Sequence, residues 1–491
     1  MRYLKVVISL VFFFPLLLQA QDLLPFTENF TKNDYDGDNQ VWGVVQGSDN
    51  AMYFANNHYF LRYDGVRWEK YTLPGKTIIR SVMAEGDRIY CGSYREFGYW
   101  QRRGGRMHYH SVSGGKTLFT GISGNEEIWK IFRSGNSVYF QSFNELYEWT
   151  GGTVTKSRFP SLVSYCYVIG GTMYAATVSD GVYYKADDGF RPVPGWEALK
   201  NKVLHGMEGY GGKIYSFTKN DGIYVTTPTG IVPWEHSLNA RLKTSGILSA
   251  KLIAKNKLAV GTSLSGIFII DMADGNFINI NRSNALRNNA VLSIGVDREN
   301  DIWLGLDNGI SHIEVNSPVS ILTDNSGELG SVYSMAVYKN GYLLGTNHGL
   351  FDYTDSKLLR LPQSQGQVWD IAHAGQDYII GHNDGTYRLS GGVYSRMSDV
   401  HGGWNCMYSK IEKAYFQANY SGIAVYYDPS DLSRYKVLSG LTKPVRNLAQ
   451  NRMGELWATD IYKGLYRIEF DPDFNVTSVR NVTRECHIND D

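Results

Sequence analysis

The stretch IWLGLDNGISHI (residues 302–313) has the pattern of a β-hairpin: an apolar run, a polar turn and a second run of alternating residues. Asn308 and Gly309 form the turn, and Asn-Gly favours the left-handed backbone that a tight hairpin turn requires. The stretch YLLGTNHGLFDY (residues 342–353) repeats the pattern, with Gly349 in the matching place. The hairpin pattern recurs along the chain, and its eleven copies begin at Met52, Ile89, Val138, Met173, Ile214, Leu258, Ile302, Tyr342, Tyr378, Ala414 and Leu456.

The spacing of these copies predicts the fold. Their starts lie on average about 40 residues apart, close to the roughly 40–45 residues of a four-stranded propeller blade. A third apolar segment precedes the hairpins, for example VLSIG at 291–295 and VWDIA at 368–372. The alternative, an all-β sandwich, does not require one sequence pattern to recur eleven times. The sequence therefore predicts an all-β protein built from propeller blades.

Eleven blades exceed a single ring, because one propeller closes with roughly 4–8 blades. The seven copies from Met52 to Ile302 are predicted to form a seven-bladed β-propeller over residues 21–318, with a boundary at the turn-rich segment around Pro318. The four remaining copies, over residues 319–480, are predicted to be four blades of a second, incomplete propeller. Residues 481–491 are predicted to be a polar tail.

Composition excludes two classes of protein. The 48 Lys and Arg balance the 48 Asp and Glu, so the chain lacks the basic excess of a surface that coats nucleic acid. With 43% hydrophobic and 20% charged residues, most of the chain is not intrinsically disordered.

The four cysteines form no CxxC or Cys/His metal spacing, and Cys91 and Cys166 are expected to be small buried residues within strands.

Residues 1–20 are predicted to be a signal peptide. Arg2 and Lys5 precede an apolar run over residues 6–18, and Ala20 supplies a small residue before the cleavage site. An uncleaved anchor helix is the alternative, although the run is shorter than the roughly 20 apolar residues of a membrane span. The rest of the chain is therefore expected to be exported and periplasmic.

One column of the third segments differs from its neighbours. It is the residue after the first apolar position, and it is variable and rich in aromatic residues and arginine. The innermost strand of a blade lines the central channel, where aromatic rings can stack on sugars and Arg can bind carboxylates or sulfates. The alternative is that these large residues only wedge neighbouring blades apart. The candidate ligand-binding residues are Trp42, Arg80, Trp129, Tyr165, His205, Tyr333, Trp369, Trp404 and Arg446, and the same column contains Ser249 and Leu292.

Two weaker motifs have simpler interpretations than a metal site. The segment NDYDGD (residues 33–38) resembles the start of a calcium loop, but Val45 stands where a bidentate Glu is needed, which favours a solvated turn. His108 and His110 lie on one face of a predicted strand without a third ligand, which favours a surface pair over a metal site.

GxSxG, HExxH, Walker A and GxGxxG motifs are absent from any supporting context. No catalytic residue, metal or cofactor is predicted, although paired glycosidase carboxylates would leave no local motif.

The repeats IWLGLDNGISHIE and YLLGTNHGLFDY, each preceded by a VxxI or VxxM segment, resemble the two-component-regulator propeller repeats of Bacteroidetes sensors. The segments at 41–74 and 88–100 (RIYCGSYREFGYW) are similar to the same repeats. The resemblance covers residues 22–480 and implies a periplasmic sensor with two seven-bladed propellers. It also implies a following triple-tyrosine immunoglobulin-like domain, a membrane helix and a histidine-kinase or helix-turn-helix output.

Sensors of this kind detect oligosaccharides and switch on polysaccharide-use genes, and the resemblance implies a homodimer. Because the sequence departs from the pattern after four blades of the second ring, the chain is expected to be a fragment, a truncated product or one partner of an assembly. The leading hypothesis is a non-enzymatic periplasmic module that binds an oligosaccharide or other small ligand and contacts no nucleic acid. The alternatives are a secreted polysaccharide hydrolase or lyase and a protein-binding scaffold, because a propeller fold does not by itself decide function.

Overall fold

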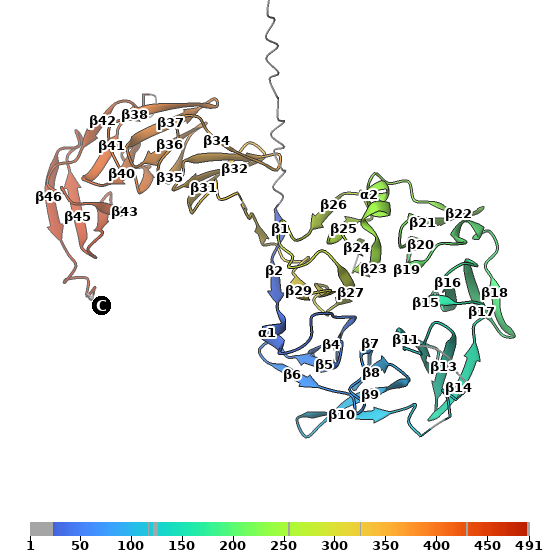
Figure 1. Ribbon diagram of the computed structural model, residues 1–491. Helices are drawn as coiled ribbons and strands as arrows, with labels where there is room; N and C mark the ends of the chain where they lie inside the picture. Colours follow the sequence, from blue (N-terminus) through green and yellow to red (C-terminus); the bar gives the residue numbers. More distant parts are fainter. Residues whose placement is uncertain are drawn as a thin grey trace, which may run out of the picture. The chain divides into compact units, whose positions relative to one another are not determined.

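The computed structural model describes residues 23–115, 117–120, 126–253, 256–324, 326–428 and 431–488, and the predicted signal peptide lies outside them. Within these ranges the chain is almost entirely β, and its strands form eleven four-stranded antiparallel sheets (Figure 1). The chain divides into two compact units, Leu24–Ile321 and the residues from 322 onward. Seven of the sheets lie in the first unit and four in the second. The predicted all-β propeller architecture is confirmed.

In the first unit each sheet is a meander of consecutive strands, except that the seventh takes its outermost strand from the start of the unit. The first three sheets are β3–β6 (Gly43–Gln46, Met52–Asn56, Tyr59–Tyr63, Trp68–Tyr71), β7–β10 (Ile79–Glu85, Arg88–Ser93, Glu96–Arg103, Arg106–Ser111) and β11–β14 (Lys130–Ser134, Ser137–Gln141, Glu145–Thr150, Thr153–Arg158). The next three are β15–β18 (Val163–Ile169, Thr172–Thr177, Val182–Ala186, Gly189–Pro192), β19–β22 (Leu204–Tyr210, Lys213–Thr218, Gly222–Thr227, Gly230–Pro233) and β23–β26 (Ile247–Ile253, Lys257–Thr262, Ile267–Asp271, Phe277–Ile280). The seventh sheet contains β27–β29 (Val291–Val296, Ile302–Leu306, Gly309–Ile313) and β2 (Thr27–Phe30).

The ring closes through the N-terminal strand. The inner strands β3, β7, β11, β15, β19, β23 and β27 contact one another in this order, and β27 returns to β3. Strand β2 pairs with β29, from Thr27 opposite Ile313 to Phe30 opposite Ile310. A short ladder of β1 (Leu24–Pro25) with β30 (Ser320–Ile321) joins the two ends of the unit, so the first unit extends slightly beyond residue 318.

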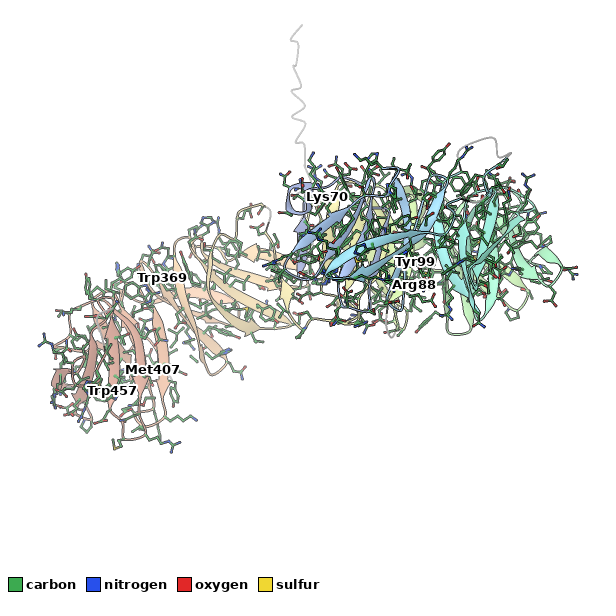
Figure 2. All side chains as sticks on the ribbon, turned by 90° about the horizontal axis from the view of Figure 1, so that it is seen from below. Lys70, Arg88, Tyr99, Trp369, Met407 and Trp457 are labelled. Atoms are coloured by element: carbon green, nitrogen blue, oxygen red, sulfur yellow. The ribbon has the colours of Figure 1, made fainter. Side chains whose placement is uncertain are left out.

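Side chains project from the sheets of both units (Figure 2), and aromatic rings pack between neighbouring sheets. Phe60 of β5 stacks on Trp100 of β9 with ring centroids 4.8 Å apart, and Phe97 of β9 stacks on Phe140 of β12 at 4.3 Å. Facing sheets lie roughly 10 Å apart, a gap that large flat side chains fill well. The high Tyr, Trp and Phe content therefore serves packing between blades.

The glycine that recurs in the second strand of several blades has a steric cause. At Gly305 an added Cβ would overlap the Ser293 hydroxyl and the Val41 carbonyl oxygen of the neighbouring blade. Sheets converge toward the ring axis, so the inner strands approach one another most closely. Only a residue without a side chain leaves room for that approach.

The second unit repeats the same meander four times. Its sheets are β31–β34 (Val332–Tyr338, Gly341–Thr346, Leu350–Thr354, Lys357–Arg360), β35–β38 (Val368–Ala374, Asp377–His382, Gly385–Ser390, Val393–Ser398), β39–β42 (Asn405–Ser409, Ala414–Asn419, Gly422–Tyr426, Tyr435–Val437) and β43–β46 (Val445–Gln450, Leu456–Asp460, Leu465–Phe470, Val476–Asn481).

The helical segments of the described chain are α1 (Lys32–Tyr35), η1 (Glu197–Leu199) and α2 (Leu238–Ser245). In the described part of the chain, no helix has the length and apolar character needed to cross a membrane.

Candidate functional site: the channel of the first propeller

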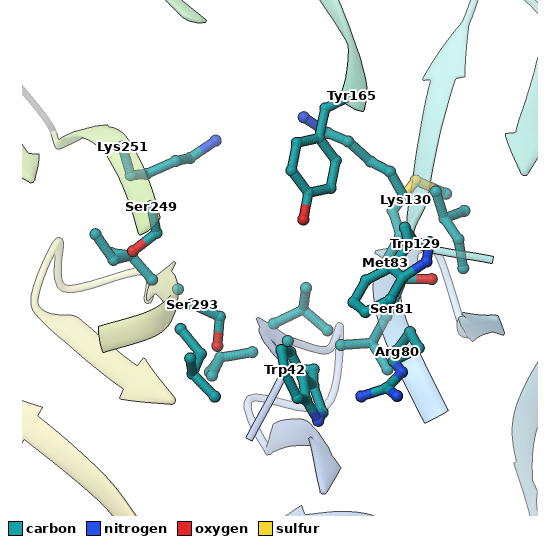
Figure 3. Close-up of a pocket in the computed structure, with 18 of the residues that line it drawn as sticks. Trp42, Arg80, Ser81, Met83, Trp129, Lys130, Tyr165, Ser249, Lys251 and Ser293 are labelled. Carbon is teal, nitrogen blue, oxygen red and sulfur yellow. The ribbon is translucent and has the colours of Figure 1, made fainter. Parts of the chain in front are cut away.

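The seven inner strands of the first unit surround a cavity of about 560 Å³ (Figure 3). Every one of these strands, or the residue just ahead of it, contributes to the lining. The cavity is therefore the central channel of the propeller. Channels of this kind are built jointly by segments far apart in the sequence, which makes them frequent ligand sites.

In five inner strands of the first unit, β7, β15, β19, β23 and β27, the predicted column falls at or beside a β-bulge near the start of the strand. In β3 and β11 the column residues Trp42 and Trp129 directly precede the strand. In β7, Ile79 lies opposite Ser93 and Ser81 opposite Gly92, which leaves Arg80 as the extra residue. Such a bulge increases the local twist and re-aims one side chain. This geometry explains why the column varies while the position before it stays apolar.

The structure corrects the column at two blades. The extra residue is Ser164 in β15 and Leu248 in β23, so Tyr165 and Ser249 each follow the bulge by one position. In β15 the small Ser164 stands between the apolar Val163 and Tyr165, so the sequence pattern assigned the column position to Tyr165 instead of Ser164. Tyr165 nevertheless lines the channel, as do the other candidates of the first unit.

Arg80 lies between two tryptophans. Its guanidinium carbon is 4.6 Å from the ring centroid of Trp42 and 4.7 Å from that of Trp129, and the two indoles meet edge to face at 5.8 Å. Arg80 also donates hydrogen bonds of 3.1 and 3.2 Å to Glu127, whose side chain is only 10% exposed. The three side chains form a rigid cluster whose positive charge is already compensated.

Neighbouring groups hold the indoles of this cluster in place. The Trp42 Nε1–H donates to Asn57 Oδ1 at 2.8 Å, and Trp129 stacks on Phe143 at 5.4 Å. Pre-positioned rings lose little conformational entropy when a ligand stacks on them. The cluster can therefore serve as a platform for a flat apolar face.

Tyr165 and His205 continue this platform around the channel. Their rings meet edge to face at 5.9 Å, and with Trp42 and Trp129 they also line an adjoining, mostly apolar cavity of about 300 Å³. Burial lowers the pKa of His205 to about 4, with the charge of Lys219 adding to the effect. His205 is thus neutral at pH 7, so its ring can both donate and accept a hydrogen bond.

Two lysines enter the channel beyond the aromatic cluster (Figure 3). The Lys130 ammonium lies 3.8 Å from the ring centroid of Tyr167 and 5.6 Å from that of Tyr165. The Lys251 ammonium lies 3.9 Å from Glu208, whose pKa burial raises. Burial, together with the charge of Lys251, lowers the pKa of Lys130 to about 8. Neither lysine stands in the predicted column, so the sequence pattern did not identify them.

The second unit contains a separate row of aromatic residues. Tyr333 stacks on Trp369 at 4.7 Å, and Trp369 meets Trp404 edge to face at 6.2 Å. The row is anchored by Tyr420, whose hydroxyl accepts a 2.9 Å hydrogen bond from Trp369 Nε1. Tyr333 is 45% exposed, so part of the row is open to solvent. The fourth candidate, Arg446, is exposed on β43, and within the described residues the ring contacts of the row do not extend to it.

The calcium-like segment does not gather its acids around one point. Asp34 caps α1, Asp36 pairs with Lys70, and Asp38 pairs with His58. In the described ranges no group of three or more His, Cys, Asp or Glu is placed to hold a metal ion.

Cys91 and Cys166 are buried free thiols, as predicted. The two other cysteines, Cys406 and Cys486, are also free.

No protein-family model matches the sequence, and no curated protein matches it. Among solved structures, the extracellular domain of a protein assigned to a hybrid two-component system of B. thetaiotaomicron is similar, with a TM-score of 0.68 and 17% identity over 94% of this chain and 67% of that one. The extracellular domain of a protein assigned to a one-component system of the same organism has a TM-score of 0.48 and 16% identity, again over 94% and 67%. Streptogramin B lyase has a TM-score of 0.48 and 12% identity over 61% of this chain and 100% of its own.

The chain thus spans about two thirds of the length of the two extracellular domains. At these identities the likeness establishes the fold. The predicted resemblance to propeller sensors is confirmed at that level.

Proposed function

We propose that this chain is the ligand-binding part of an extracytoplasmic sensor and that its ligand is an oligosaccharide held in the channel of the first propeller. The observation that carries the proposal is the aromatic cluster of Trp42, Arg80 and Trp129, which continues through Tyr165 and His205 along the channel. Sugar rings present flat C–H faces that stack on aromatic rings, while neutral imidazole and phenol groups hydrogen-bond their hydroxyls. The similarity in fold to the extracellular domain of one protein assigned to a hybrid two-component system supports the sensor role and a periplasmic location.

The channel is large enough for such a ligand. Its volume of about 560 Å³ falls within the roughly 300–1,000 Å³ of typical small-molecule sites. The aromatic groups project from different blades, so a ligand bound between them would bridge the ring and bias the arrangement of its blades. Such bridging is one physical route by which binding can alter the state of a sensor.

The test is calorimetric titration of the purified chain with a panel of neutral and acidic oligosaccharides. Trp129→Ala should weaken binding by about 2–10-fold, since an aromatic contact contributes about 0.5–1.5 kcal/mol beyond its buried area. Trp149→Ala is a matched control, because Trp149 belongs to β13 and stacks on Tyr99 away from the channel. Thermal unfolding of both variants verifies that they are folded.

Three results would count against the proposal. These are the absence of binding to the whole panel, equal binding by the Trp129→Ala variant, and release of shorter fragments from the oligosaccharides. The last result would favour a propeller hydrolase or lyase instead.

A further inference from the structure

The side chains that line the channel carry an unbalanced charge. Three cations, Arg80, Lys130 and Lys251, contribute to the lining, and none of its residues is a carboxylate. Arg80 is compensated from behind by Glu127. The two lysines therefore provide the charge that faces the open space.

The lysines are poorly compensated by the protein itself. Among the described residues Lys130 has no ion pair within 4.0 Å, and its ammonium rests on the rings of Tyr167 and Tyr165. Glu208 lies 3.9 Å from Lys251, which is longer than a hydrogen bond. A partly buried cation with no close anion attracts one strongly, because the surrounding protein screens charge less than water does.

Lys130 stands at a position where other inner strands make a contact between blades. It lies opposite Gln141 of β12, and at the matching positions three other inner strands have serines that donate to a carbonyl of the next blade. Those serines are Ser81, Ser249 and Ser293. Lys130 gives up this contact between blades and instead extends its amine toward the channel (Figure 3). Gln141, opposite Lys130, makes the contact to the next blade instead: its side-chain amide donates to the Ser164 carbonyl and accepts from the Cys166 N–H. The contact between blades therefore does not need the Lys130 side chain, whose amine is left to the channel.

We propose, on the basis of the oligosaccharide-binding function above, that the ligand is acidic and that its carboxylate or sulfate group binds between Lys130 and Lys251. Figure 3 shows the two side chains extending into the same opening, with the Tyr165 hydroxyl directed into it. The aromatic cluster holds the sugar rings while the lysines select the anion. Lysine ammonium groups form charge-assisted hydrogen bonds with either anion.

Binding of such a ligand depends on pH in a defined direction. Since the pKa of Lys130 is about 8, the ammonium form that attracts the anion is lost as the pH rises through this value. Binding should therefore weaken between pH 7 and pH 9. The titratable and charged groups that face Lys130 are Tyr165, Cys166 and Tyr167 on β15, Glu208 on β19 and Lys251 on β23.

The experiment compares acidic and neutral ligands of equal length by calorimetry. The probes are tetragalacturonate, which carries carboxylates only, and a sulfated carrageenan tetrasaccharide, which carries sulfates only, as the two acidic arms, with xylotetraose and galactotetraose as neutral counterparts. We expect at least one acidic probe to bind tenfold or more tightly than both neutral ones, and the arm that binds identifies carboxylate or sulfate. Lys130→Met and Lys251→Gln should each reduce that preference at least fivefold. Lys213→Met, on the exposed start of β20, should leave it unchanged.

The outcomes separate this inference from the function on which it rests. If neutral probes bind as tightly as acidic ones, or the lysine variants retain the preference, the acidic ligand is refuted while oligosaccharide binding stands. If no probe of either class binds the folded chain, both proposals fail. Lys251 is half exposed, so Lys251→Gln remains informative even if Lys130→Met does not fold.

Discussion

Closure of the first propeller depends on a single strand supplied by the start of the unit, and Phe30 is its main anchor. Phe30 is 7% exposed and packs against three aromatic rings, at 5.3 Å from Tyr63, 5.4 Å from Trp68 and 5.9 Å from Trp303. Truncation of a buried Phe to Ala costs about 3–5 kcal/mol, because transfer free energy is lost and a cavity remains. Phe30→Ala should therefore destabilise the first propeller by about this amount.

This loss converts into a measurable change in melting temperature. At about 2.1 cal/mol/K per residue, a unit of about 300 residues has an unfolding entropy of about 0.6 kcal/mol/K. The melting temperature of the first propeller should fall by about 5–8 °C in differential scanning calorimetry. Hydrogen exchange should rise first in β29, which pairs with β2.

The control is Val66→Ala, because Val66 is 83% exposed and its truncation should change stability by less than about 0.5 kcal/mol. A fall of less than about 2 °C for Phe30→Ala would refute the idea that β2 closes the ring, since a cost of about 1 kcal/mol corresponds to an unanchored strand. Unchanged exchange in β29 would lead to the same conclusion.

Two further predictions concern packing and protonation. Gly305→Ala should lower stability by about 1–3 kcal/mol in urea unfolding, because its Cβ would overlap the Val41 carbonyl, whereas Gly75→Ala meets only ordinary contacts and should be neutral. The native pKa of His205, about 4, lies below its unfolded value of about 6.5, so the unfolded chain binds more protons between these pH values. His205 should thus lower stability as the pH falls from about 6.5 to about 4. His205→Gln should reduce that slope, and an unchanged slope would disprove neutral burial.

Much of the blade architecture was predictable because it repeats. The hairpin that begins at Ile302 recurs at a nearly constant interval, and each copy contains local information for two paired strands. The closing strand at 27–30 was not predicted, because its partner lies almost the whole unit away and the pairing leaves no periodic signal. The shift at Ser164 and Leu248 was missed for a related reason, since a bulge is a property of strand pairing and not of residue type.

The candidate channel was only partly predictable. The variable column identified Trp42, Arg80 and Trp129, because these positions line the channel and are free to vary, whereas the position before each of them is apolar and buried. Lys130 and Lys251 were not recognised, since a lysine in a strand normally lies on a solvated face. A signal was present at Lys130, which occupies a position where three other inner strands have serine.

The sequence by itself determined the class of fold, the number of blades and the division into seven and four, because these follow from a local pattern and its period. Only the tertiary structure decided which side chains meet. The channel is formed by seven strands spread from Gly43 to Val296, and the direction of each side chain depends on how its strand is paired and on the neighbouring blade. Periodicity determines the repeating unit, whereas the contacts between units depend on three-dimensional packing that no single repeat encodes.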